Sequence, residues 1–264
     1  MRPVTSRSPI QGVIFDFGST LSILRRPWSV VIAECTIALT GHLRRSGLQL
    51  PANFAELWSA MLRFAVQHAE RDGIERTADD ILAALLASQG YADLTPDFIG
   101  QAMDIYFGAE DAVRAPATGA LSALAELRAA GYRLAVLSNT ISGQWVQRWT
   151  DRFGFRPYLD AVVTSDAIAI RKPRPEAFTT TMTQMGLARP EAVVMVGDTV
   201  AHDIVGAQAA AMRTVQISLA EDQSFSDRSA SSWLVGEITA TPDAFITELA
   251  ALAPVLDRWQ SDGR

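Results

Sequence analysis

The sequence predicts an α/β fold, in which a doubly wound parallel sheet is interrupted by one all-helical segment. Two observations support this prediction. From about Pro116 onward, short apolar runs alternate with helical stretches, a pattern typical of parallel sheets covered by helices on both faces. Between Leu21 and Arg114, in contrast, only helical stretches occur. A chain of 264 residues is long enough for a core with an inserted module.

The first strand is expected at residues 12–16, which are apolar up to Phe15 and are followed by a turn at residues 18–20. Helices are expected at residues 29–43, 54–69, 77–88 and 96–107. In the second of them, apolar residues recur every three or four positions, as on one helix face. Thr77 followed by Asp80 predicts a capped start for the third. We therefore expect an all-helical insertion directly after the first strand.

Turn signals and helix-ending glycines divide the rest of the chain into alternating elements. The predicted strands are residues 132–137, 161–164, 192–196, 214–217 and 233–235. The predicted helices are residues 118–130, 142–153, 175–185, 200–211 and 242–252. Residues 221–232, rich in Ser and Asp, are expected to form a surface loop.

Composition narrows the possible partners and the compartment. The net charge of −6 disfavours a nucleic-acid partner. The single cysteine, Cys35, excludes an internal disulfide and suits a reducing compartment. No apolar run approaches the ~20 residues that span a bilayer, and residues 1–9 lack the apolar region of a signal peptide. We expect a cytoplasmic monomer or homodimer that binds neither nucleic acid nor membrane.

The basic residues are almost all of one type. Of the 23 basic residues, all are arginine except Lys172. Most surface positions therefore accept arginine, and a lone lysine invites a chemical explanation. Lys172 lies in the loop that leads into the predicted helix at residues 175–185.

Polar side chains follow the predicted strands at the edge where parallel sheets bind ligands. This group comprises Asp16, Ser138, Asn139, Lys172 and Asp198, with Asp203 about one helical turn further on. Carboxylates are hard oxygen ligands that suit Mg²⁺. A metal ion and a lysine neutralise charge on a phosphoryl group, and a carboxylate can attack phosphorus as a nucleophile. The pattern therefore predicts a Mg²⁺-binding phosphoryl site centred on an aspartate.

Four motifs in order resemble those of the haloacid dehalogenase (HAD) superfamily of hydrolases, and the resemblance covers nearly the whole chain. They occupy residues 13–21, 137–139, 172–178 and 196–203. The resemblance implies a Rossmann-like core at residues 1–21 and 115–264. It further implies that residues 22–114 form a helical cap domain, inserted after the first motif.

The resemblance also implies roles at the metal site. Asp16 and Asp198 would bind Mg²⁺ directly, together with the backbone carbonyl of Gly18. Asp203 would complete or orient the metal shell. His202 lies beside this acidic motif, but because it lies inside a predicted helix we expect it to point away from the site.

Further implied roles concern a phosphorylated small-molecule substrate. Asp16 would be the nucleophile that becomes an aspartyl-phosphate. Ser138 would hydrogen-bond the phosphoryl oxygens, and Lys172 would bridge nucleophile and phosphate. Asn139 and Thr20 complete the implied phosphate-binding set.

The sequence departs from the phosphatase pattern at Gly18. Phosphatases of this family carry a second aspartate there, which protonates the leaving group and later activates water. Glycine has no proton to give. A general acid–base group typically contributes ~10²–10⁴-fold to the rate, which corresponds to about 3–5 kcal/mol of barrier. The hydrolysis of esters with poor leaving groups should therefore be slowed most.

Four interpretations remain open. The enzyme could act on substrates whose leaving group needs little protonation, or receive the acid from substrate or cap. The chain could instead be a catalytically impaired binding or regulatory protein. Carbon–phosphorus cleavage of the phosphonatase kind is disfavoured, since it needs a cap lysine and residues 22–114 contain none. A 2-haloacid dehalogenase is less favoured as well, because those enzymes relax the acidic pair kept here as Asp198 and Asp203.

Overall fold

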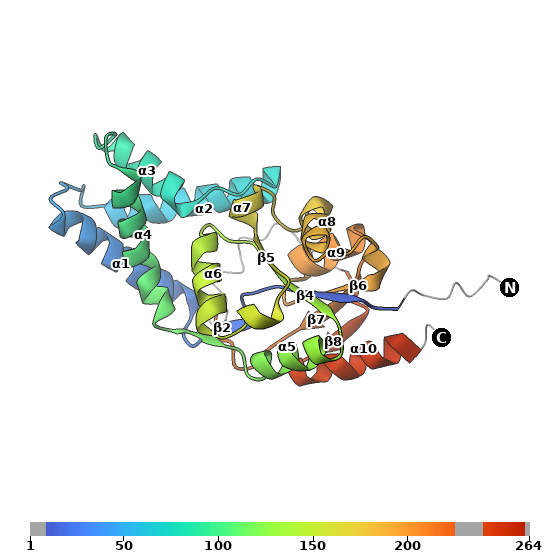
Figure 1. Cartoon of the computed structure of the whole chain (residues 1–264). Helices are drawn as coiled ribbons and strands as arrows, with labels where there is room; N and C mark the ends of the chain where they lie inside the picture. Colours follow the sequence, from blue (N-terminus) through green and yellow to red (C-terminus); the bar gives the residue numbers. More distant parts are fainter. Residues whose placement is uncertain (1–8, 225–239, 262–264) are drawn as a thin grey trace.

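A computed structural model describes residues 9–224 and 240–261. Within them, six strands form one parallel sheet in the order β5-β4-β1-β6-β7-β8 (Figure 1). These strands are β1 (Gly12–Phe15), β4 (Arg133–Ser138), β5 (Ala161–Thr164), β6 (Val193–Gly197), β7 (Arg213–Ile217) and β8 (Ala244–Ile246). The predicted α/β class is confirmed, and β1 lies at the centre of the sheet, between β4 and β6.

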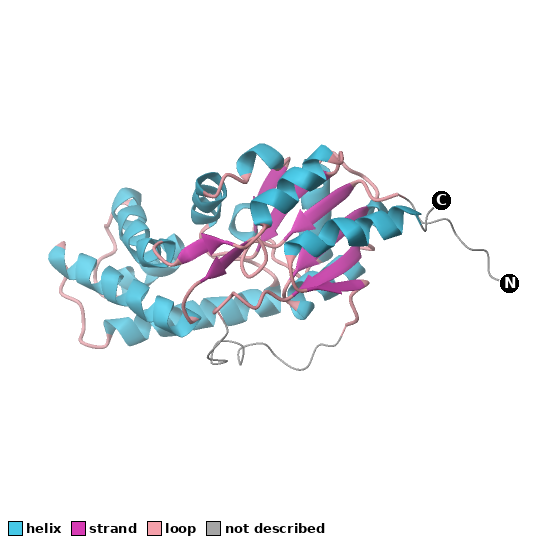
Figure 2. Ribbon diagram, turned by 90° about the horizontal axis from the view of Figure 1, so that it is seen from below, coloured by secondary structure: helices cyan, strands magenta, loops and turns pink. Residues whose placement is uncertain are grey.

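Helices cover both faces of the sheet, as Figure 2 shows from below. Val13 and Phe15 of β1 belong to a core cluster shared with α5 (Ala120–Ala129) and α10 (Leu252–Ser261). Ile14 faces the opposite side, in a second cluster with α8 (Pro175–Gln184) and α9 (Val205–Ala209). Because neighbouring residues of a strand point to opposite faces, a strand buried on both sides must be apolar throughout. This explains the uninterrupted apolar run of β1.

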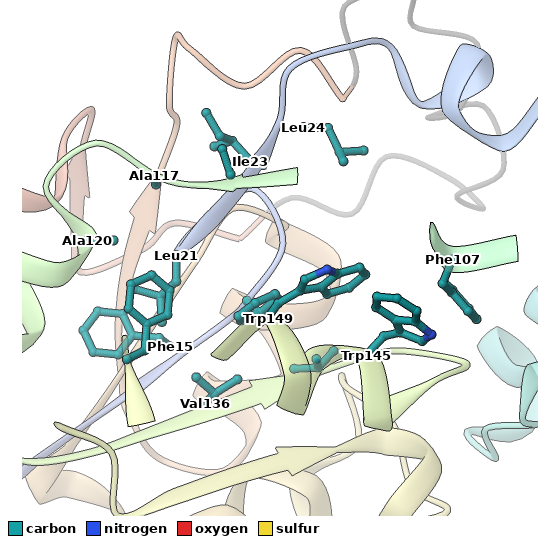
Figure 3. Close-up of a cluster of buried hydrophobic side chains, with 14 of the residues drawn as sticks. Phe15, Leu21, Ile23, Leu24, Phe107, Ala117, Ala120, Val136, Trp145 and Trp149 are labelled. Atoms are coloured by element: carbon teal, nitrogen blue, oxygen red, sulfur yellow. The ribbon is translucent and has the colours of Figure 1, made fainter. Parts of the chain in front are cut away.

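The segment after β1 forms four helices that lie to one side of the sheet (Figure 1). They are α1 (Trp28–Arg45), α2 (Phe54–Asp72), α3 (Ala78–Ser88) and α4 (Pro96–Asp111). The predicted cap of the third helix is confirmed, since Thr77 Oγ1 accepts a hydrogen bond from the Asp80 N–H at 3.1 Å. α6 (Gly143–Arg152) meets this segment through an aromatic contact, with the rings of Phe107 and Trp145 6.0 Å apart (Figure 3).

Where the chain crosses between the sheet and the four helices, it forms a small antiparallel ribbon. β2 (Ser22–Leu24) pairs with β3 (Arg114–Pro116), and Ile23 lies opposite Ala115. The expectation of helices alone between residues 21 and 114 is therefore wrong at both ends. Three residues are too few to show a strand periodicity, and the partner lies about 90 residues away in the chain.

Three further elements differ from expectation. The helix predicted at residues 242–252 is instead β8, a short 3₁₀ turn at Leu249–Ala251, and α10. The helix predicted at residues 200–211 begins as a π-helix, Val200–Ile204, before α9. A one-turn helix, α7 (Ser165–Ile168), was not predicted at all. Tertiary pairing overrides local pattern in such short pieces.

The C-terminal loop is described only in part. The strand predicted at residues 233–235 and residues 225–232 of the predicted surface loop lie outside the described residues. Ser224, also placed in that loop, is buried, and its carbonyl accepts a hydrogen bond from the Trp28 N–H at 3.0 Å. Within the described part of the chain, no helix is both long and apolar enough to cross a bilayer.

Candidate active site

Three carboxylates meet at the carboxyl ends of neighbouring parallel strands. Asp16 directly follows β1 and Asp198 directly follows β6, its neighbour in the sheet. The Asp16 N–H donates to the carbonyl of Val196 at 2.9 Å, which holds the two strand ends in register. One carboxylate oxygen from each of Asp16, Asp198 and Asp203 lies within 4.8 Å of the other two. The structure therefore brings the three predicted acidic residues together.

Lys172 lies among these carboxylates. Its Nζ donates to Asp16 Oδ1 at 2.5 Å and to Asp203 Oδ1 at 2.6 Å, and only 2% of the residue is exposed. The second oxygen of Asp203 accepts a hydrogen bond from the Thr199 N–H at 3.0 Å. A Cβ at Gly197 would lie 2.3 Å from Asp203 Cγ, so the close approach of Asp203 to β6 requires glycine at that position.

Asn139 positions the loop that carries Lys172. The Lys172 N–H donates to Asn139 Oδ1 at 2.8 Å, and Asn139 Nδ2 donates back to the Lys172 carbonyl at 2.9 Å. This pair of hydrogen bonds joins the end of β4 to the loop before α8. The sequence predicts Asn139 only as a member of the phosphate-binding set, and Asn139 does line the cavity. Its role in positioning the Lys172 loop was not predicted.

The carboxylates carry more negative charge than Lys172 can balance. Burial raises the pKa of Asp16 to about 6, opposed by the charge of Lys172 and reinforced by that of Asp203. Burial also raises the pKa of Asp198, and the charges of Asp16 and Asp203 raise it further. Burial lowers the pKa of Lys172, but the two carboxylates that it contacts raise it more. A hard, oxygen-only donor set with surplus negative charge fits a divalent cation such as Mg²⁺.

These residues form one end of a cavity of about 660 Å³ that reaches α1, α2 and α4. Gly18, Ser138 and Lys172 line it. A Cβ built at Gly18 meets no atom within 4 Å, so the position has room for a side chain. Thr20 does not line the cavity. It is fully buried, and its hydroxyl has no hydrogen-bond partner among the described residues.

The far wall of the cavity is mostly apolar and includes Cys35, the only cysteine. Burial raises the pKa of the Cys35 thiol to about 12, and the nearby charge of Glu110 adds to this effect. Cys35 is therefore a protonated, weakly polar part of the wall at neutral pH.

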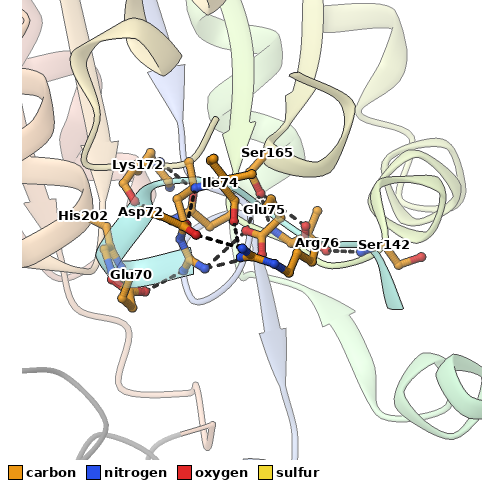
Figure 4. A network of polar contacts seen from close by, with 12 residues as sticks. Glu70, Asp72, Ile74, Glu75, Arg76, Ser142, Ser165, Lys172 and His202 are labelled. Carbon is orange, nitrogen blue, oxygen red and sulfur yellow. Dashed lines mark hydrogen bonds and ion pairs between the residues drawn. The ribbon is translucent and has the colours of Figure 1, made fainter. Parts of the chain in front are cut away.

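A polar network joins the end of α2 to the sheet side of the site (Figure 4). Arg171 pairs with Glu70 at 2.7 Å and with Glu75 at 3.3 Å. Glu75 in turn accepts a hydrogen bond from Ser165 Oγ at 2.8 Å. His202 Nε2 lies 3.0 Å from Glu70 Oε2, and His202 lines the cavity. The expectation that His202 points away from the site is therefore wrong.

Comparison with known proteins agrees with this geometry. The family model for haloacid dehalogenase-like hydrolases matches residues 10–211, which include every site residue named above. A glyceraldehyde 3-phosphate phosphatase of Methanopyrus kandleri is 28% identical over 221 residues, covering 83% of this chain and 88% of that protein. A protein of the same name from Methanothermobacter thermautotrophicus is 32% identical over 136 residues, which is 51% of this chain and 58% of that relative's length.

Among solved structures, a 2-haloacid dehalogenase from Pseudomonas syringae pv. Tomato has the same fold. The two structures superpose with a TM-score of 0.66 at 21% identity, over 95% of this chain and 99% of the other. The four motifs, the parallel sheet and the match to the family model together lead to one conclusion. The chain belongs to the haloacid dehalogenase-like hydrolase family.

Proposed function

We propose that the protein is a Mg²⁺-dependent phosphatase that hydrolyses a phosphorylated small molecule through an aspartyl-phosphate on Asp16. One observation carries the proposal: one carboxylate oxygen from each of Asp16, Asp198 and Asp203 lies within 4.8 Å of the other two, and Lys172 Nζ contacts two of the three residues. The names of the two phosphatase relatives support the same chemistry.

The proposed reaction has two steps. An oxygen of Asp16 forms a bond to phosphorus while the ester P–O bond breaks, and the electron pair leaves with the alcohol oxygen. The departing alkoxide takes its proton from solvent water. A second water then attacks the aspartyl-phosphate, the bond between phosphorus and the Asp16 oxygen breaks, and the Asp16 carboxylate is regenerated, so that the net products are an alcohol and inorganic phosphate. Lys172 orients the Asp16 carboxylate through the 2.5 Å contact and favours its charged form. Ser138 at the end of β4 would hold the phosphoryl oxygens.

The metal would be held by Asp16, Asp198 and the Gly18 carbonyl, with Asp203 orienting the shell. Mg²⁺ in this place supplies positive charge that neutralises the transferring phosphoryl group. Asp203 is already constrained on both sides, by Lys172 and by the Thr199 N–H. A side chain held at both of its oxygens is suited to orienting the other metal ligands.

We further propose that residues 22–114 act as a cap over a core of residues 1–21 and 115–264. The chain passes between these parts at β2 and β3, which pair with each other, so the adjoining residues would serve as hinges. Closure would exclude water from the cavity, which strengthens the electrostatic interactions of Asp16 and Lys172. The contacts of Arg171 with Glu70 and Glu75 join the proposed cap to the core in this structure.

Phosphate release tests the proposal directly. Purified protein would be assayed with acetyl phosphate, p-nitrophenyl phosphate and glyceraldehyde 3-phosphate, in Mg²⁺ and after chelation. We expect release in Mg²⁺, a loss of at least about 10-fold on chelation, and recovery when Mg²⁺ is restored. Chloride release from 2-chloropropionate without metal, and no phosphate release, would support a dehalogenase instead. If none of these compounds is hydrolysed, the result would favour a binding protein.

Replacing Gly18 with aspartate is expected to raise the hydrolysis of alkyl phosphates such as glycerol phosphate by about 10²–10⁴-fold. The cavity has room for the new side chain, which would supply the missing acid and base. Acetyl phosphate, with its good leaving group, should gain much less. The measurement is kcat/KM for both substrates.

The matched control for that experiment is Gly18→Asn, which is similar in size but has no proton of suitable acidity to give. An equal gain in Gly18→Asn would contradict the acid–base explanation. It would point instead to a better fit of substrate beside residue 18.

A further inference from the structure

We infer that the group esterified to phosphate in the substrate carries no anionic group and is largely apolar, with an aromatic or branched aliphatic body. The inference rests on the proposed phosphatase function and names the substrate class of the same site. Three observations carry it: the chemistry of the cavity wall, the pairing of its cations, and its size.

The wall that faces away from the carboxylates is mostly apolar, and its apolar side chains come from four helices. It includes two residues from α1, two from α2, one from α4 and one from α6: Val31, Ile32, Leu62, Val66, Phe107 and Trp149. Phe17, next to the nucleophile, stacks on Trp149 with ring centroids 6.2 Å apart, so the apolar surface continues to the reacting end. A group leaving from phosphorus on this side would meet hydrocarbon and aromatic rings.

Arg114, a cation in this wall, already uses all three of its side-chain nitrogens in hydrogen bonds. Its Nε and NH2 donate to Glu110 at 3.0 and 2.5 Å, and its NH1 donates to Ser22 Oγ at 2.7 Å. Its guanidinium also lies 4.5 Å from the centre of the Trp149 ring. Both members of the Arg114–Glu110 pair are nearly buried, so a substrate anion would have to break a desolvated ion pair to reach Arg114.

The other cations also have carboxylate partners, although the Arg171 Nε–H is buried without a hydrogen-bond partner among the described residues. Arg171 contacts Glu70 and Glu75, and Lys172 contacts Asp16 and Asp203. Among the described residues that line the cavity, no Arg or Lys is left without a carboxylate partner. A second phosphate or a carboxylate on the leaving group would therefore meet no Arg or Lys free of a carboxylate partner, which makes its burial unfavourable.

The size of the cavity excludes a very small substrate as the best fit. A volume of about 660 Å³ lies within the range of ~300–1,000 Å³ typical of sites for organic ligands. A three-carbon polar ester would leave most of the apolar wall in contact with water. An aryl or branched alkyl group would cover it, and burial of apolar surface favours binding. Aryl esters also need little protonation on leaving, which suits Gly18.

The test is a series of phenyl, 4-methylphenyl and 4-propylphenyl phosphates, whose leaving groups have similar acidity. We expect kcat/KM to rise by about 3–4-fold per added carbon, so by about 30–60-fold for the three carbons that separate phenyl from 4-propylphenyl phosphate. Glyceraldehyde 3-phosphate and 4-carboxyphenyl phosphate should be poorer than 4-propylphenyl phosphate. A flat series, or a preference for either polar ester, would overturn the inference while leaving the phosphatase function standing.

Two variants with substitutions on α1 test whether the cavity wall causes the gain from the propyl group. Ile32→Asn places an amide in the cavity wall and should abolish most of the gain from the propyl group. Ile37→Asn makes the same change at a residue that is 71% exposed on α1, and should keep the full gain. Equal behaviour of the two variants would contradict the assignment of the wall as the specificity surface.

Binding separates failure of the inference from failure of the proposed function. Affinities of phenyl-, 4-methylphenyl- and 4-propylphenylphosphonate, which cannot be hydrolysed, would be measured by calorimetry with Mg²⁺. If no ester is hydrolysed but affinity rises along this series, the apolar site stands and the phosphatase proposal falls. If the phosphonates bind equally or not at all, the inference falls, whether or not esters are hydrolysed.

Discussion

Replacing Asp16 with asparagine is expected to lower phosphate release by at least about 10³-fold, because the nucleophile is lost. Folding stability should be unchanged or slightly higher. The asparagine side chain would keep the shape of the carboxylate without its buried charge, and burial already disfavours that charge, as the raised pKa of Asp16 indicates. The measurements are kcat/KM and the unfolding midpoint of both proteins in chelator.

The comparison variant is Asp198→Asn, which removes a proposed metal ligand but leaves the nucleophile. It should respond to added Mg²⁺, with activity partly recovered at high concentration, whereas Asp16→Asn should not. If Asp16→Asn kept substantial turnover, or if Mg²⁺ rescued it, Asp16 would be only a ligand and the covalent mechanism would be wrong.

Replacing Lys172 with methionine is expected to remove turnover by a similar factor and, unlike Asp16→Asn, to destabilise the fold. Lys172 Nζ contacts two buried carboxylates, and removing one partner of a buried ion pair typically costs about 3–5 kcal/mol. Mg²⁺ should restore part of this loss by supplying positive charge. The free energy of unfolding in urea would be measured with chelator and with Mg²⁺.

The charge-matched control is Arg189→Met, whose side chain is 51% exposed beside Glu191. Exposed pairs contribute only ~0–1 kcal/mol, so this variant should unfold like the native protein. A Lys172→Met protein as stable as the native one in chelator would show that Lys172 does not hold the carboxylates together. The lone lysine would then need another explanation.

Much of the core could be predicted because its strands are buried on both faces. Val13 and Phe15 pack on one side and Ile14 on the other, so β1 had to be apolar throughout and stood out in the sequence. β8 and β2 could not be predicted in this way. Each has three residues and is stabilised by pairing with a distant segment, which leaves no local periodicity.

The candidate site also contains some residues that could be placed from the sequence and others that could not. Asp16, Ser138 and Asp198 follow strands or end them, and the ends of neighbouring parallel strands meet at one edge of the sheet. Their proximity could therefore be predicted from the strands alone. Thr20 was predicted at the site as well, yet it is fully buried and does not line the cavity.

The sequence by itself determined the α/β class, the strand-end carboxylates and the lone lysine among them, because these follow from local patterns of burial and turns. Only the tertiary structure decided that Asn139 holds the Lys172 loop, that Arg114 packs on the ring of Trp149, and that the cavity wall is mostly apolar. The wall brings together side chains from separate helices, and the Lys172 loop contacts an asparagine 33 residues away. Such contacts depend on how the elements pack against one another, which no local pattern in the chain encodes.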